Sequence, residues 1–320
     1  MNKKLRVAVL MGGPSGEREV SLASGREVVR ALAGNPNFEV LPIEVGQDGR
    51  WIAQISKSQI DVAFIAMHGR GGEDGTIQGL LELLGIPYTG SGVLASALGM
   101  DKVRSLSLFR DAGLKVPKYQ VINTKLRGNL GTMLHSMELP VVTKPNYHGS
   151  SLGVEICHNQ KELRKGFKEA QRYDKDVIVQ QFIKGRELTC AVLGNEKPKA
   201  LPVVEIVPRK GDFYDYASKY EEGGSDHIVP AKIPAKVAKQ IQQWAVKSHQ
   251  IVGCAGFSRV DFIWGHPSPK ASGGEHLYVL EINTIPGLTP TSLFPDAAKA
   301  GGYEFSELIE KLIHLALERK

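Results

Sequence analysis

The chain has 320 residues, of which 42% are hydrophobic and 23% charged, and its 40 basic and 34 acidic side chains give a net charge of +6. Such a composition is typical of a globular protein of about two or three domains that buries a core without disulfides. Three isolated cysteines argue against a disulfide framework or a zinc site, scattered basic residues argue against nucleic acid as a partner, and no apolar run approaches the roughly 18 residues of a membrane span.

Residues 1–99 alternate strand and helix signals, which predicts parallel βαβ units in a doubly wound sheet. Ligands of such sheets bind at the carboxyl ends of the strands, where the loops "GGPSGER" and "HGRGGEDG" lie. The first apolar run is too short for a secretory signal, and with the unpaired cysteines this indicates a cytoplasmic protein. We expect strands at 6–11, 38–45 and 61–67, and helices at 26–34 and 75–85.

Two further units follow, at 100–183 and 184–320, and each mixes helices with strands in the manner of an α+β domain. A polar segment at about 211–227 is too long for an ordinary connection, and we interpret it as a lid. The first unit is expected to hold helices at 101–113 and 160–173 and strands at 139–145, 154–159 and 176–183. The second is expected to hold strands at 187–194, 200–208, 259–264 and 279–284 and helices at 235–253 and about 305–320.

The last two expected strands, "RVDFIW" and "VLEINT", carry polar side chains inside apolar runs. Because strand side chains alternate between faces, Arg259 shares a face with Asp261, and Glu281 shares one with Asn283. An antiparallel pairing of the two strands can place all four on one surface. Two carboxylates and an amide oxygen are hard ligands that suit Mg²⁺. The alternative is a solvated sheet face that carries unrelated charges.

The loop "KPNYHGSSLG" at 144–153 consists mainly of small and turn-forming residues. Its backbone N–H groups can approach phosphate oxygens, and Lys144 adds a positive charge. A plain turn is the alternative. The loop is not a P-loop, and "GGPSGE" is not a dinucleotide fingerprint, which disfavours a dehydrogenase.

Together these motifs resemble the ATP-grasp superfamily, and more closely the D-alanine–D-alanine ligases of bacterial cell-wall synthesis. The resemblance implies a three-domain ATP-grasp fold, in which an N-terminal α/β domain (1–99) precedes a central domain (100–183) and a C-terminal domain (184–320) that clasp ATP between antiparallel sheets. It also implies the reaction: ATP phosphorylates one D-alanine, and the amine of a second attacks the acylphosphate to give D-alanyl-D-alanine for peptidoglycan. The motifs are "GGPSGEREVSLASG", "HGRGGEDGTIQGLLELLGIPYTGS", "DK" at 101, "KPNYHGSSLG", "FYDYASKY", "SRVDF" and "LEINTIPGLTPTSL".

The resemblance also assigns roles around the nucleotide. Two Mg²⁺ ions, or Mn²⁺ in their place, are expected on Asp261, Glu281 and Asn283. Many relatives place a carboxylate at the position of Gln180, where the amide oxygen can still accept from the adenine amino group, without charge assistance. The phosphates are assigned to Lys102, Lys144 and Lys219, the adenine to the hinge residues Gln180, Gln181 and Ile183, and the ribose to Glu187. For each lysine alone, a solvated surface role is the alternative.

The substrate residues come from the same resemblance. Glu17 is expected to bind the ammonium of the first D-alanine in a network with Ser150 and Tyr220, and Arg259 and the Gly287 N–H to stabilise the oxyanion. The remaining substrate contacts are assigned to His68, Ser292 and Leu293, the last two at the carboxylate of the second D-alanine. Alternatives are a place for Glu17 in the first turn of its helix, a structural His68, and a helix N-cap for Ser292.

Two rival functions remain. A silent nucleotide-binding module would lack part of the metal set or of the lysines, and the sequence retains both. Another ATP-grasp ligase is disfavoured by "EREVS" and by the "KY" of the lid. Relatives are commonly dimers, so the expected partners are two D-alanines, ATP and a second copy of the chain, with no nucleic acid and no membrane.

Overall fold

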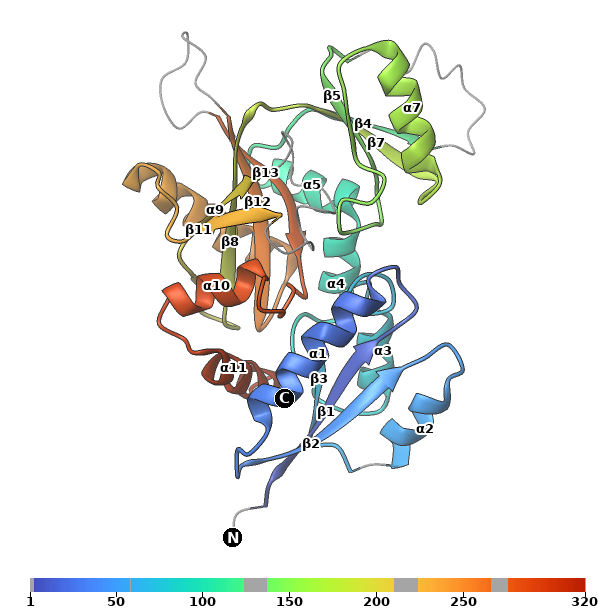
Figure 1. Cartoon of the computed structure of the whole chain (residues 1–320), viewed down its shortest axis with the longest axis vertical. Helices are drawn as coiled ribbons and strands as arrows, with labels where there is room; N and C mark the ends of the chain where they lie inside the picture. The colour runs from blue at the N-terminus through green and yellow to red at the C-terminus, as the bar shows by residue number, and fades with distance from the viewer. Residues whose placement is uncertain (1–2, 58, 124–136, 210–223, 266–275, 320) are drawn as a thin grey trace.

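The computed structural model describes residues 3–57, 59–123, 137–209, 224–265 and 276–319. These residues form three sheets, A, B and C, in chain order (Figure 1). No helix in the described ranges is long and apolar enough to cross a membrane. The expected residues Lys219 and Tyr220, and the lid up to residue 223, lie outside the described residues.

Sheet A is parallel, with strand order β2-β1-β3. The three predicted strands and two predicted helices are present, although α1 begins eight residues before the predicted helix. Two short helices, α2 and α4, were not predicted, since α4 ("VLASALGM") is apolar almost throughout and shows no helical period. The elements are β1 (Leu5–Gly12), α1 (Arg18–Leu32), β2 (Phe38–Val45), α2 (Arg50–Lys57), β3 (Val62–Ile65), α3 (Thr76–Leu83) and α4 (Val93–Met100).

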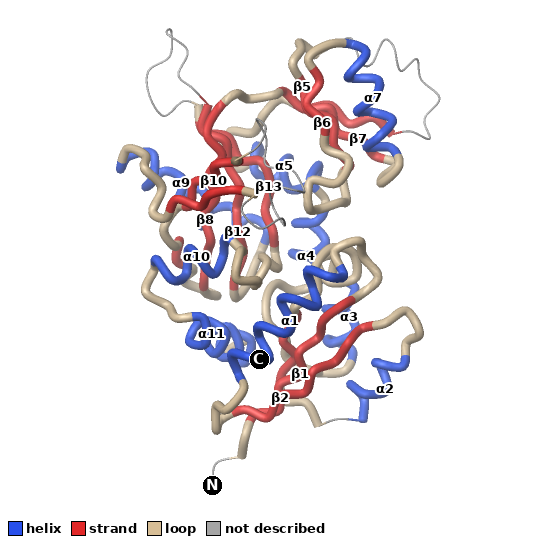
Figure 2. Tube along the Cα trace, in the orientation of Figure 1, coloured by secondary structure: helices blue, strands red, loops and turns tan. Residues whose placement is uncertain are grey.

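Sheet B is antiparallel, with strand order β4-β7-β5-β6. Helix α7 packs on one face through a cluster that includes Val141, Phe167 and Val179 (Figure 2). Strand β4, at the edge of the sheet, was not predicted. The elements are α5 (Lys102–Asp111), β4 (Tyr119–Asn123), β5 (Val141–Pro145), β6 (Glu155–Cys157), α7 (Gln160–Gln171) and β7 (Asp176–Gln181).

Sheet C has the strand order β11-β10-β8-β12-β13, with β9 paired to β8. The single strand predicted at 200–208 is wrong: β9 and β10 are separate, because Pro202 between them has no N–H for a sheet ladder. Residues 225–227, at the end of the expected lid, belong instead to β11. The elements are β8 (Gly185–Leu193), β9 (Lys199–Ala200), β10 (Val204–Pro208), β11 (Ser225–Ile228), α9 (Ala235–Val252), β12 (Phe257–Gly265), β13 (Leu277–Asn283), α10 (Leu293–Ala300) and α11 (Phe305–Leu317).

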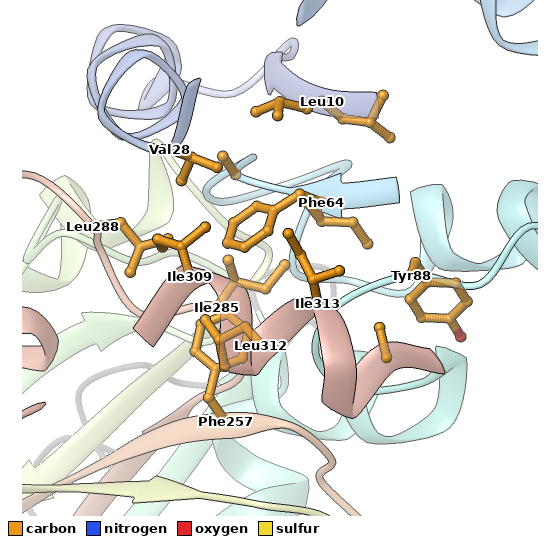
Figure 3. Packing of buried hydrophobic residues seen from close by; sticks show 14 of the residues in the cluster. Leu10, Val28, Phe64, Tyr88, Phe257, Ile285, Leu288, Ile309, Leu312 and Ile313 are labelled. Carbon is orange, nitrogen blue, oxygen red and sulfur yellow. The ribbon is translucent and has the colours of Figure 1, made fainter. Parts of the chain in front are cut away.

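The last helix returns to the first sheet. In Figure 3, Ile309 and Ile313 of α11 lie against Phe64 of β3, and Leu312 lies near Ile285, all within one buried cluster. Phe257 of β12 belongs to the same cluster. Sheet A therefore shares its core with the C-terminal part of the chain, which fixes the loops of sheet A beside sheet C.

Candidate active site

A cavity of about 840 Å³ lies between sheet B and sheet C, which the chain joins through the crossing from β7 to β8 (Figure 2). Val142, opposite Gln180 in sheet B, and Ile183, in the crossing, form what we call its apolar end, and Leu280 and charged side chains from both sheets complete the lining. Eight of the residues expected at the nucleotide and the metal line it: Lys102, Lys144, Gln180, Gln181, Ile183, Glu187, Asp261 and Glu281.

The predicted pairing of the last two strands is confirmed. Strands β12 and β13 are antiparallel, with Asp261 opposite Glu281 and Arg259 opposite Asn283. The alternate residues Val260 and Ile282 lie in the core on the other face. One face of sheet C therefore carries the four polar side chains, as the alternation of the sequence required.

Asp261 is buried and accepts hydrogen bonds from three strands. Arg259 donates from Nε to Oδ1 and from Nη2 to Oδ2, both at 2.8 Å. Thr189 Oγ1 on β8 lies 2.6 Å from Oδ1, and Asn283 Nδ2 lies 3.0 Å from Oδ2. We did not predict Thr189, because a threonine in a strand is ordinary and its partner lies far along the chain.

Lys102 connects helix α5 to this acidic face. Its Nζ lies 3.2 Å from Glu281 Oε2 and donates to the carbonyl of His148 at 2.8 Å. Lys102, which we expected at the phosphates, therefore contacts both a candidate metal ligand and the 144–153 loop. Its charge balances Glu281, as Arg259 balances Asp261.

Asp101, which precedes Lys102, holds the same loop in place. Its carboxylate accepts from Tyr147 Oη at 2.7 Å, from Asn146 Nδ2 at 2.9 Å and from the backbone N–H of Arg104 at 3.1 Å. Burial alone raises the pKa of Asp101, but these hydrogen bonds outweigh it and bring the pKa below its usual value. The ionised Asp101 thus caps α5 and ties it to the 144–153 loop, a role that the sequence did not reveal.

The donor set fits a hard divalent cation. Asp261, Glu281 and Asn283 bring two carboxylates and an amide to one sheet face, and oxygen ligands of this kind suit Mg²⁺. No group of three His, Cys, Asp or Glu residues suited to a metal occurs within the described ranges. The third oxygen here is an amide, and the absence of thiol and imidazole donors disfavours zinc.

Glu17 belongs to a second group of site residues, where the loops that carry Gly69 and Gly149 meet. It is 9% exposed, and a Cβ atom built on Gly149 would lie 2.8 Å from Glu17 Oε1, while one built on Gly69 would lie 3.1 Å away. Glu17 is the N-cap residue of α1, but its side chain makes no capping hydrogen bond. The carboxylate therefore faces the loops of sheets A and B, next to Ser150, which has a φ of 54°.

His68 has a protein partner on its ring. Its Nε2 lies 2.9 Å from Ser24 Oγ, which in turn accepts from the backbone N–H of Leu288 at 3.2 Å. Burial lowers the pKa of His68, which favours the neutral imidazole. These contacts agree with the structural alternative and link the end of β3 to the loop that carries Gly287.

The expected second-substrate residues lie at the start of α10. Ser292 is the N-cap residue, but its Oγ lies 2.8 Å from Thr289 Oγ1 and makes no capping bond to the helix. A Cβ built on Gly287 would lie 2.7 Å from that Oγ, so a larger residue at this position would displace the Ser292 hydroxyl. Leu293 is buried in the first turn of α10.

Glu73 is a further acid near Glu17 that we did not single out. It accepts from the backbone N–H of Gly69 at 2.8 Å, and burial together with the charge of Glu17 raises its pKa from 4.5 to about 8. The loop motif contained Glu73, yet nothing there distinguished it from Asp74, which bonds the N–H groups of Gly71 and Thr76.

Three comparisons relate the chain to known proteins. A family model described as "D-ala D-ala ligase C-terminus" matches residues 108–314, and "D-ala D-ala ligase N-terminus" matches 6–59 and 53–91. The D-alanine–D-alanine ligase of Desulforudis audaxviator is 48% identical over 98% of this chain and 99% of that relative.

Solved structures agree with this result. The Bacillus anthracis D-alanine–D-alanine ligase complexed with ATP is 31% identical, with a TM-score of 0.82 over 98% of both chains. The VanG D-Ala:D-Ser ligase of Enterococcus faecalis is 32% identical, with a TM-score of 0.80 over 98% of this chain and 100% of that one.

The raised pKa of Glu73 predicts a pH-dependent cost to stability. Between about 4.5 and about 8 the folded protein keeps the Glu73 proton while the unfolded chain loses it, so stability falls as pH rises through this window. Glu73→Gln removes this dependence. The melting temperature of the variant minus that of wild type should therefore be larger at about pH 8.5 than at about pH 5. Thermal denaturation at both pH values, with the exposed Glu196→Gln as control, tests it. If the melting temperatures of Glu73→Gln and wild type differ by the same amount at both pH values, the pKa of Glu73 is not raised.

Proposed function

The chain belongs to the family of D-alanine–D-alanine ligases, and we propose that its site joins two D-alanines through an acylphosphate made from ATP. The chain has the ATP-grasp fold and is an ATP-dependent ligase of peptidoglycan precursor synthesis. The observation that carries the site proposal is the pair of acids, Asp261 and Glu281, on a cavity wall between two sheets, each with a cation beside it.

The nucleotide occupies the cavity between sheets B and C in this proposal. Its base lies at the apolar end, beside Gln180 and the backbone of Gln181 and Ile183, and its ribose near Glu187. Its phosphates meet Lys144 and Lys102, whose positive charges lie on the cavity wall. We assign Lys219, in the lid, to the phosphates as well, and this assignment rests on the family resemblance alone.

Asp261, Glu281 and Asn283 would hold two Mg²⁺ ions, or Mn²⁺ in their place. Bound there, a divalent ion supplies charge neutralisation for the phosphates during transfer. The guanidinium of Arg259, held flat by its two bonds to Asp261, is positioned for the negative charge of the tetrahedral intermediate. The backbone N–H of Gly287 is the second donor that we propose for that charge.

The amino-acid substrates lie between the loops of sheet A and the face of sheet C. Glu17 binds the ammonium of the first D-alanine, because its carboxylate is buried at the junction of two loops and makes no cap for α1. Ser150 and, from the lid, Tyr220 complete that network. Ser292 and Leu293 bind the carboxylate of the second D-alanine at the start of α10, while His68 orders the loop behind them.

We also propose a homodimer, formed through an apolar surface on α3 and α4. Leu83 is 89% exposed and Leu94 is 72% exposed, and Leu84 and Val93 add to the same surface. Helices α3 and α4 pack together, and we propose that these side chains form one patch of the kind that marks a protein interface. The enzyme would work in the cytoplasm, where ATP is available and the three buried free cysteines stay reduced.

A coupled assay of ADP release with single amino acids tests the function. D-alanine should support ADP release, whereas L-alanine should give only the background rate, because its Cα has the opposite configuration to the substrate that we propose. D-serine and D-lactate belong in the panel as competitors of the second D-alanine, and product analysis should show mainly D-alanyl-D-alanine. Equal ADP release with L- and D-alanine would refute the assignment.

Leu94→Glu tests the dimer. A charge in the middle of the apolar patch should convert the protein to a monomer at micromolar concentration, because an unpaired charge cannot be buried in an interface. Sedimentation velocity measures this, with Val121→Glu, on the edge strand β4, as a control that should stay dimeric. A monomeric wild type, or a dimeric Leu94→Glu variant, contradicts the proposed interface.

A further inference from the structure

Gln180 stands at the apolar end of the cavity. It lies on β7, opposite Tyr119 of β4 and Val142 of β5. Its neighbours Val177 and Val179 belong to the core beneath α7, so strand alternation directs Gln180 to the opposite face, toward the cavity that it lines. Only 3% of the residue is exposed.

The side-chain amide nitrogen of Gln180 is an unsatisfied hydrogen-bond donor. Its Nε2 is buried and has no hydrogen-bond partner among the described residues. A carboxamide has one donating and one accepting end, and a half-turn of its terminal bond exchanges them. Since no protein group holds the nitrogen, the protein does not fix which end faces the cavity. The ligand can therefore set the orientation.

The surroundings suit a purine with a polar substituent at this edge. Val142, Ile183 and Leu280 line the slot, and they offer flat apolar contact but no hydrogen bonds from their side chains. Glu205 also lines the cavity, but its carboxylate is bound by Arg186, with Nε 2.6 Å from Oε1. Gln180 is thus a buried hydrogen-bonding side chain placed to read the edge of the base.

We propose that Gln180 reads position 6 of the purine and accepts a 6-oxo as well as a 6-amino purine nucleotide. A 6-amino group donates and meets the amide oxygen, whereas a 6-oxo group accepts and meets the amide nitrogen after the half-turn. A carboxylate can only accept and therefore serves the amino group alone. The inference rests on the proposed function, which places the base at this end of the cavity.

The test compares ATP with inosine triphosphate in wild type, Gln180→Glu and Gln171→Glu. The ratio of kcat/KM for inosine triphosphate to that for ATP should be at least about tenfold higher in wild type than in Gln180→Glu, because two acceptors then face each other. Inosine also carries a proton on N1, but this difference is common to all variants and cancels between the ratios. Gln171→Glu adds the same charge on the exposed end of α7 and should keep the wild-type ratio.

Equal ratios in wild type and Gln180→Glu overturn the inference. Equilibrium binding of the two nucleotides without amino acids gives a readout separate from turnover, and it should show the same difference. Gln180→Ala covers the case in which the glutamate variant does not fold: it should weaken both nucleotides by similar factors, and a loss for ATP alone overturns the inference. Absence of D-alanine-dependent ATP use in wild type would instead refute the proposed function.

Discussion

The carboxylate of Asp261 is held by donors from β8, β12 and β13, and the rest of the cleft is arranged around it. A buried carboxylate is tolerated only when it is paired and hydrogen-bonded. Three adjacent strands supply these partners, so the acid is fixed by the sheet itself and not by a loop. The geometry of the candidate metal site therefore follows from the register of sheet C.

The remaining parts of the site reach this face through a few polar contacts. Lys102 joins α5 to Glu281, and Asp101 joins α5 to the 144–153 loop. Helix α11 closes the core of sheet A, which brings the loop of Glu17 to the same place (Figure 3). The site thus forms where elements of sheets A, B and C meet, and none of the three sheets contains it alone.

The sequence predicted the parts of the fold that have strong local signals. The shared face of Arg259, Asp261, Glu281 and Asn283 followed from alternation, although a register shift lets Leu280 line the cavity beside Glu281. The residues of the nucleotide cavity followed from the family resemblance. Helix α4 was missed because it is apolar almost throughout and its periodicity is weak, and α2 was missed because it has only eight residues. Thr189, Asp101 and Glu73 were missed because their roles depend on partners or surroundings that only the folded chain brings together.

Binding of Mn²⁺ in the presence of ADP, followed by electron paramagnetic resonance, tests most directly whether the acidic face of sheet C holds the metal. Asp261→Asn and Glu281→Gln should each weaken this binding by at least about tenfold, while circular dichroism shows an unchanged fold. The exposed Glu196→Gln is the matched control and should bind as wild type does. If both site variants bind Mn²⁺ with wild-type affinity, the metal lies elsewhere and the account of the cleft is wrong.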